Sequence, residues 1–160
     1  MADLKTNVMR ILDQKKIPYI PHEYNSPDGN APDGVTVANM IGKTASEVYK
    51  TLVTKSSSNR YYVFVVPSDA QLDLKKAAKA VNEKSVEMIK QKELLPLTGY
   101  VHGGCSPVGM KKLFKTVFHS DVLLLETVTV SAGKVGRQIE IAPKLIIDAV
   151  NGITADITNS

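Results

Sequence analysis

A lysine lies at the start of a strand-like run, in the segment Tyr49-Lys50-Thr51-Leu52. If Leu52 and its neighbours pack inward, the ammonium of Lys50 becomes partly buried. A partly desolvated ammonium beside a cleft can hold an anion or polarise a carbonyl group. For Lys50 taken alone, a surface lysine with a buried stem is the simpler interpretation. Lys50 is therefore a candidate only if other residues join it.

A glycine-containing loop, Gly103-Gly104-Cys105-Ser106-Pro107-Val108-Gly109, is the second candidate. Glycines have no Cβ, so a ligand can approach the backbone, and successive N–H groups can form a nest that binds an anion. Beside an ester such a nest would stabilise the oxyanion of the reaction. A tight turn explains the glycines equally well. The loop is not a P-loop, because it lacks the Gly-Lys-Ser/Thr ending.

The same loop brings His102 and Cys105 close together in sequence. Their spacing of three places them face to face only if the loop folds back, so a buried, inert cysteine is the favoured interpretation. One cysteine with scattered histidines at 22, 102 and 119 does not suit a four-ligand zinc site. The sequence also holds no HExxH helix, GxSxG elbow or carboxylate pair, so no metal or cofactor is predicted.

The third candidate is Ser131, in the segment Val130-Ser131-Ala132-Gly133 that leads into a turn at Gly136. A serine that ends a strand before a glycine turn can direct its hydroxyl group at a small ligand. A plain hairpin with a bulged turn fits the same residues.

The elements that must position these candidates are a mixture of helices and strands. Helices are predicted around 4–12, 36–42, 74–81 and 143–150, and a short strand followed by a helix over 85–99. Strands are predicted at 19–24, 47–57, 61–66, 127–130, 137–142 and 153–157. Residues 25–34 are turn formers and predict a long loop, whereas 122–125 are apolar without a clear period.

Four residues predict helix starts. Asp3, Thr36 and Asp73 are expected N-caps, and Pro143 is expected at the first helical position. Pro21 lacks an N–H donor and predicts that the strand at 19–24 lies at a sheet edge.

Strands and helices do not alternate strictly, so a doubly wound parallel sheet is not expected. The pattern predicts the α+β class, with a mixed, barrel-like sheet surrounded by helices. The chain has 160 residues, which suits one domain over 1–160. One cysteine, no apolar run long enough to span a membrane and no signal-peptide core predict a cytoplasmic protein without membrane contact.

Basic residues gather in two segments of a chain whose net charge is +4. Residues 75–92 hold six Lys and two Glu, and three more lysines follow at 111, 112 and 115. Such clusters can present a basic face to a polyanion, although a solvated helix surface is the more common reason for them.

Taken together, the candidate segments resemble the YbaK family. The resemblance rests on Tyr49-Lys50-Thr51-Leu52, the loop from Gly103 to Lys112, Val130-Ser131-Ala132-Gly133 and Gln138-Ile139-Glu140-Ile141-Ala142-Pro143. Their order and spacing match from Ile17 to Asp156, nearly the whole chain. Each motif alone is weak, but the series is specific.

The resemblance implies a free-standing aminoacyl-tRNA deacylase, related to the editing domain inserted in bacterial prolyl-tRNA synthetase. It implies a mixed barrel-like sheet, activity on Cys-tRNA and above all on Cys-tRNA(Pro), and prolyl-tRNA synthetase as a partner. The lysines would then contact tRNA phosphates without reading sequence: Lys75, Lys76, Lys79, Lys111, Lys112 and Lys115.

Matching positions imply roles for individual residues. Lys50 and Gly103 would act directly on the ester, with Gly104 beside Gly103. The residues expected to line the substrate pocket are Tyr24, Thr51, Gly104 and Ser131. His102 and Cys105 stand at positions that are mostly aliphatic in the family, and neither is given a catalytic role.

No general base or activated nucleophile is evident, so the nucleophile must come from elsewhere. A cysteinyl ester carries its own thiol, with an unperturbed pKa of about 8.5. That thiol could attack the ester carbonyl and release a thiolactone, while Lys50 and the amides of Gly103 and Gly104 stabilise the alkoxide.

Three other functions fit the same residues. One is a related deacylase for Ala-tRNA(Pro) that uses water as its nucleophile. Another is a module that binds tRNA or a synthetase without catalysis. The third is a hydrolase with Cys105 as its nucleophile, which a thiol-alkylating reagent would inactivate.

Overall fold

The computed structural model describes residues 5–26 and 31–159. In chain order the elements are α1 (Asn7–Gln14), β1 (Ile20–Glu23), α2 (Gly34–Met40), β2 (Tyr49–Ser56), β3 (Tyr61–Pro67), α3 (Leu74–Ala80), β4 (Val86–Met88), α4 (Gln91–Thr98), β5 (Lys115–His119), the 3₁₀ helix η1 (Ser120–Leu124), β6 (Val128–Ser131), β7 (Arg137–Ile141), α5 (Pro143–Ala149) and β8 (Ile153–Ala155). No described helix is long and apolar enough to cross a membrane.

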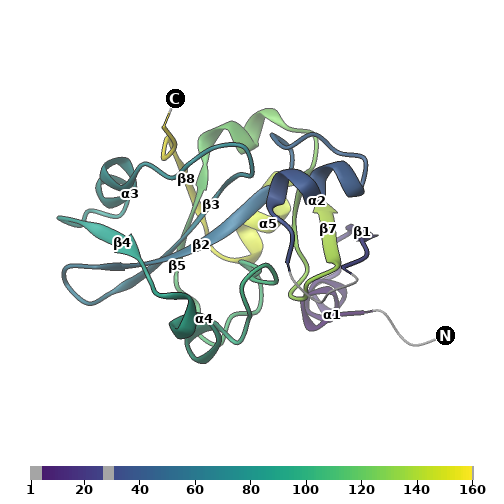
Figure 1. The fold of residues 1–160 in the computed structure, drawn as a ribbon, viewed down its shortest axis with the longest axis horizontal. Coiled ribbons are helices and arrows are strands. Elements are labelled where there is room, and N and C mark those ends of the chain that lie inside the picture. Colours follow the sequence, from purple (N-terminus) through teal and green to yellow (C-terminus); the bar gives the residue numbers. More distant parts are fainter. Residues whose placement is uncertain (1–4, 27–30, 160) are drawn as a thin grey trace.

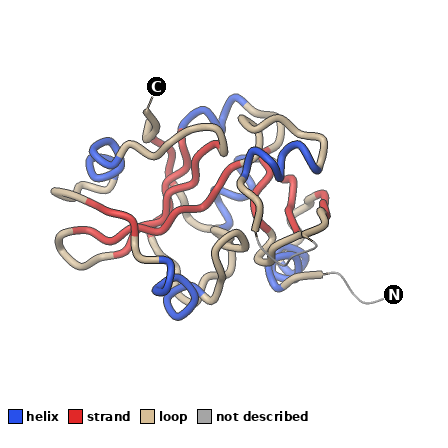
Figure 2. Tube along the Cα trace, in the orientation of Figure 1, coloured by secondary structure: helices blue, strands red, loops and turns tan. Residues whose placement is uncertain are grey.

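The strands form two sheets rather than one (Figures 1 and 2). A five-stranded mixed sheet has the order β4-β2-β3-β5-β8, and a three-stranded antiparallel sheet has the order β1-β7-β6. Within the described residues the sheets are linked by the bridge between Val48 and Thr129. In this bridge the N–H of Thr129 donates to Glu47 O at 3.0 Å. The α+β class with mixed sheets is therefore confirmed, with the difference that the strands do not close into a barrel, because so short a link does not join the two sheets along their length.

The central strand β3 is apolar throughout because both faces of the five-stranded sheet are covered. Phe64 and Val66 pack with Ala77 of α3 on one face. Val63 and Val65 pack on the other face, in the core that includes residues of α1, α5, β6 and β7. A strand buried on both sides is expected to lack the usual polar alternation. This packing holds β2, and with it Lys50, rigidly against β3.

Of the four predicted helix starts, two are correct, one is wrong and one lies outside the described residues. Asp73 caps α3 by accepting from the N–H groups of Lys75 and Lys76, and Pro143 opens α5 as predicted. Helix α2 begins earlier than predicted, because Asp33 rather than Thr36 is its N-cap. For α1 the N-cap is Thr6, and the predicted cap Asp3 lies outside the described residues.

The remaining predictions differ in detail. Strand β1 lies at a sheet edge, as Pro21 indicated. The loop predicted at 25–34 includes residues 27–30, which lie outside the described part. Helix α2 begins at Gly34, the last residue of that predicted loop. The apolar residues at 122–125 fall largely in η1. Strand β5 was not predicted, although Thr116, Val117 and Phe118 are typical strand residues.

Candidate functional site

A cavity of about 300 Å³ lies where the two sheets meet α2 and the glycine loop. Its walls come from the start of β2, from α2, from the segment 102–105 and from β6 and β7. Five of the six catalytic and pocket residues predicted from the sequence line it: Tyr24, Lys50, Thr51, Gly103 and Ser131. Residues more than 100 positions apart in the chain therefore share one small space.

Lys50 is the only lysine among the residues that line this cavity. It is half-buried near the start of β2, where it pairs with Val66 of β3. Burial lowers the pKa of its ammonium, and the negative charge of Asp69 partly opposes that shift. A cation with part of its hydration removed interacts more strongly with a negative charge that develops beside it. The position suits stabilisation of an oxyanion.

Gly103 presents backbone to the cavity. Its φ is +85°, a left-handed conformation that favours glycine, and a Cβ at this position would overlap the methyl group of Ala31. Within the described chain its N–H donates to no protein acceptor. The N–H is therefore available to a ligand.

Gly104 is placed differently from its neighbour. It is buried, it does not line the cavity, and its N–H donates to Val101 O at 3.0 Å. A Cβ there would lie 3.1 Å from the backbone N of Val135, so close backbone packing explains this glycine. The structure does not bring Gly104 together with the other candidates, and a nest of two free amides is not formed.

Two buried oxygens in the cavity wall have no hydrogen-bond partner among the described residues: Thr51 Oγ1 and Gln138 Oε1. Leaving a buried polar group unsatisfied typically costs about 1–3 kcal/mol, so such atoms require an explanation. Both residues line the cavity, so a hydrogen-bond donor bound beside them is a candidate partner for these oxygens. Ser131 is also buried in this wall, and its Oγ accepts from the N–H of Gly133 at 3.2 Å.

Gln138 was not predicted as a site residue, although it belongs to one of the motifs. The signal is the strand period: Ile139 and Ile141 point into the core, so Gln138 and Glu140 share the opposite face of β7. The register of β6 and β7 also places Gln138 directly opposite Ser131. Alternation along β7 could have found it once Ser131 was a candidate.

His102 and Cys105 both line the cavity, His102 with an exposed side chain and Cys105 with a buried one. Burial raises the pKa of the Cys105 thiol to about 12, and a hydrogen bond with Thr98 only partly opposes this. At neutral pH the group is a protonated thiol and a poor nucleophile.

Cys105→Ala is therefore expected to retain, within a few-fold of the wild type, the deacylation activity that the family resemblance implies, because no thiolate is lost. Rates measured before and after treatment with iodoacetamide should agree for both proteins. Complete inactivation of the variant would instead identify Cys105 as an enzyme nucleophile.

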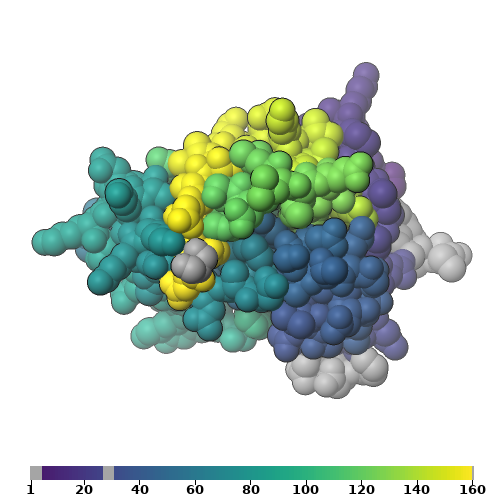
Figure 3. Space-filling model, turned by 90° about the horizontal axis from the view of Figure 1, so that it is seen from above, coloured from purple at the N-terminus to yellow at the C-terminus, as the bar shows by residue number. Residues whose placement is uncertain are grey.

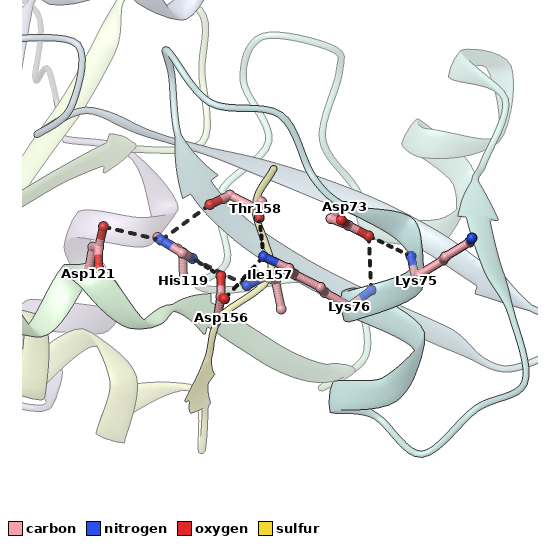
Figure 4. Close-up of polar contacts among 8 residues, drawn as sticks. All are labelled: Asp73, Lys75, Lys76, His119, Asp121, Asp156, Ile157 and Thr158. Carbon is pink, nitrogen blue, oxygen red and sulfur yellow. Dashed lines mark hydrogen bonds and ion pairs between the residues drawn. The ribbon is translucent and has the colours of Figure 1, made fainter. Parts of the chain in front are cut away.

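The predicted tRNA-binding lysines lie outside the cavity wall. Lys75, Lys76 and Lys79 are on α3, and Figure 4 shows Lys76 directed at the C-terminal segment, where its Nζ bonds Asp156 at 3.1 Å and Thr158 O at 2.9 Å. Lys111 Nζ donates to Pro96 O at 3.2 Å. Lys112 borders a second, smaller hollow beside Ile11, and Lys115 opens β5.

No group of three or more His, Cys, Asp or Glu side chains within residues 5–26 and 31–159 is arranged to hold a metal ion. The polar residues that line the cavity supply an ammonium, hydroxyl groups, an amide, an imidazole, a thiol and the carboxylate of Asp33, which accepts from Thr36 N. This set suits recognition of a polar organic ligand that carries a carbonyl group.

Comparison with known proteins agrees with this description. A family model, the aminoacyl-tRNA editing domain, matches residues 29–149. A curated protein of Enterococcus faecalis, named "Putative Cys-tRNA(Pro)/Cys-tRNA(Cys) deacylase EbsC", is 43% identical over 154 residues, which cover 96% of this chain and 93% of that protein.

Two solved structures share the fold. A "putative trans-editing enzyme for prolyl tRNA synthetase" has a TM-score of 0.81 at 21% identity, over 97% of this chain and 99% of its own. The "hypothetical protein APE2540" has a TM-score of 0.86 at 22% identity, over 96% and 100%. The family model spans most of the chain, and it includes every residue of the cavity wall except Tyr24. The chain therefore belongs to the aminoacyl-tRNA editing domain family, whose members remove amino acids from aminoacyl-tRNA.

Proposed function

We propose that this protein is a trans-editing deacylase that clears Cys-tRNA(Pro) and Cys-tRNA(Cys). The observation that carries the proposal is that one cavity is lined by the half-buried Lys50, by the backbone of Gly103, whose N–H has no partner in the described chain, and by Thr51 and Gln138, which each carry an unpartnered buried oxygen. The name of the E. faecalis relative supplies the cysteinyl substrate. Such a protein acts where tRNA is charged, in the cytoplasm.

The residues divide into two roles. The Lys50 ammonium and the Gly103 N–H stabilise the negative charge that forms on the ester carbonyl oxygen during attack. Ser131, Thr51 and Tyr24, joined by Gln138, orient the aminoacyl group. Gln138 Oε1 is an acceptor without a donor among the described residues. The α-ammonium of a cysteinyl ester could supply that donor. Gly104 shapes the loop and does not contact the substrate.

The nucleophile in this proposal is the thiol of the substrate. Its sulfur forms a bond to the ester carbonyl carbon, the bond from that carbon to the ribose oxygen breaks, and the ribose oxygen gains the proton that the thiol gave up. The products are a four-membered thiolactone and uncharged tRNA. Ring strain makes this step difficult, so the cavity must hold the thiol in a reactive rotamer and stabilise the alkoxide.

A deacylation panel tests the proposed substrate. We expect the wild-type protein to release cysteine from Cys-tRNA rapidly and to leave Ala-tRNA and Pro-tRNA nearly intact, with the same rates in EDTA. The cavity volume suits a small side chain, and only cysteine carries a thiol. Preferential cleavage of Ala-tRNA(Pro) would mean a water-dependent relative, and no cleavage with tight tRNA binding would mean a binding module.

Contacts with the tRNA body are proposed for three lysines of α3 and for three lysines of the segment 111–115. Prolyl-tRNA synthetase is proposed as the partner that selects the tRNA. Each phosphate contact contributes roughly 0.7–0.9 to the slope of log K against log salt. Replacing Lys111, Lys112 and Lys115 together by Met is expected to reduce that slope. Among single variants, Lys76→Met should reduce it less than Lys112→Met, because Lys76 already bonds Asp156 and Thr158. A wild-type affinity independent of salt would contradict the phosphate contacts.

A further inference from the structure

A buried carboxylate that the proposed reaction does not use lies next to the cavity, at Glu140 of β7. Its Oε1 contacts His22 Nε2 at 2.9 Å, and its Oε2 lies 3.0 Å from Lys43 Nζ and accepts from Thr127 Oγ1 at 2.6 Å. Its side chain is only 11% exposed. Four separate segments of the chain meet at this one side chain.

Glu140 is ionised at neutral pH. The hydrogen bond from Thr127 is the largest cause that lowers its pKa to about 2, and the contacts with His22 and Lys43 add to it against the opposing effect of burial. A charge-assisted hydrogen bond is shorter and stronger than a neutral one. The carboxylate therefore holds its three partners in one arrangement.

Two of these partners connect Glu140 to the cavity wall. Lys43 follows α2 closely and is joined to it by the hydrogen bond from Lys43 N to Ala38 O at 2.8 Å. His22 lies directly opposite Gln138 in the register of β1 and β7, and both Gln138 and Glu140 face away from the core. Figure 3 shows the α2 region (blue) beside the segment of η1 and the turn after it (green), from which Thr127 comes.

Helix α2 depends on such a link because its own anchoring is small. It has seven residues, of which only Val37 and Ala38 are buried, and a helix this short is marginal without tertiary contacts. Its N-terminal end is held by Asp33, which accepts from Thr36 N at 2.7 Å. Asp33, Gly34, Val35 and Val37 all line the cavity, so a shift of α2 would change the shape of the site.

We propose that Glu140 is a positioning residue, which fixes α2 through Lys43 and ties β7, the strand that carries Gln138, to β1 through His22, and so sets the size of the cavity around the aminoacyl group. This inference rests on the proposed function, since it concerns which aminoacyl groups the site accepts. Glu140 touches no reacting atom, so its effect falls on substrate fit rather than on the chemical step.

Lys43→Met and Glu140→Gln test this role. At a temperature where all proteins are fully folded by circular dichroism, we expect KM for Cys-tRNA to rise about fivefold to tenfold while kcat stays within about twofold. The preference for Cys-tRNA over Ala-tRNA should fall by a similar factor, because a looser wall no longer matches one side chain. Lys43→Arg keeps the charge and should retain the wild-type KM and preference.

Lys144→Met is the matched control, because it removes an exposed lysine from α5, outside the cavity. If Lys43→Met keeps both the wild-type KM and the wild-type preference, Glu140 has only a structural role and the inference is wrong. Failure of Glu140→Gln to fold leaves that comparison intact, since the Lys43 variants decide it. Failure of the proposed function looks different, because the wild-type protein itself would not deacylate Cys-tRNA.

Discussion

Lys50→Ala is expected to lower kcat for Cys-tRNA deacylation by about 10²–10³, the usual effect of removing one well-placed oxyanion donor. The ammonium is half-buried and partly desolvated, so solvent cannot replace the positive charge that the alanine variant loses. Thermal stability should fall little, because the side chain of Lys50 makes no hydrogen bond or ion pair within the described residues. Single-turnover deacylation together with a thermal melt measures both quantities.

The matched control is Lys55→Ala, on the same strand β2 but outside the cavity. Lys55 lies over the ring of Tyr61 at 5.7 Å, so this variant tests the loss of a lysine from β2 without loss of the proposed donor. It should keep the wild-type kcat. A Lys50→Ala protein with near-native turnover would exclude the proposed role, because the remaining Gly103 N–H would then suffice.

Much of the fold follows from local signals. Asp73 before an alanine-rich helix, Gly99 at the end of the predicted helix, and the β-branched run of β3 each predict an element that the structure contains, and Gly99 adopts the left-handed φ of +88° after α4. The barrel could not be predicted correctly, because sheet closure depends on which strands meet. Among residues 5–26 and 31–159 the bridge between Val48 and Thr129 is the one β-bridge that joins the two sheets, and no local pattern reports it.

The site shows the same division between local and tertiary information. Lys50, Gly103 and Ser131 stand out by residue type, and the structure places all three in one wall. The difference between Gly103 and Gly104 is not visible in sequence, because it depends on the folded loop: the Gly104 N–H donates to Val101 O, whereas the Gly103 N–H has no acceptor among the described residues. The unpartnered state of Gln138 Oε1 likewise becomes evident only when every neighbour is known.

The nucleophile separates the two possible routes of deacylation, attack by water and attack by the substrate thiol. The residues of the cavity wall offer no group poised to attack: the Cys105 thiol is protonated at neutral pH, and the Lys50 ammonium has no lone pair. His102 is exposed at the wall, where it could activate water. Attack by water and attack by the substrate thiol therefore predict different relative rates for Ser-tRNA and Cys-tRNA, whose side chains differ only in oxygen against sulfur.

Ser-tRNA is expected to be cleaved at least about 10²-fold more slowly than Cys-tRNA, because a thiol is a few per cent thiolate at pH 7 whereas a hydroxyl is essentially never ionised. Serine is slightly smaller than cysteine, so it fits the same cavity, and Ser-tRNA should inhibit Cys-tRNA deacylation competitively although it is not turned over. S-methylcysteinyl-tRNA, which keeps the sulfur but cannot ionise, should also resist cleavage. Cleavage of Ser-tRNA within about tenfold of the Cys-tRNA rate would mean that water attacks both esters, with His102 as the candidate base.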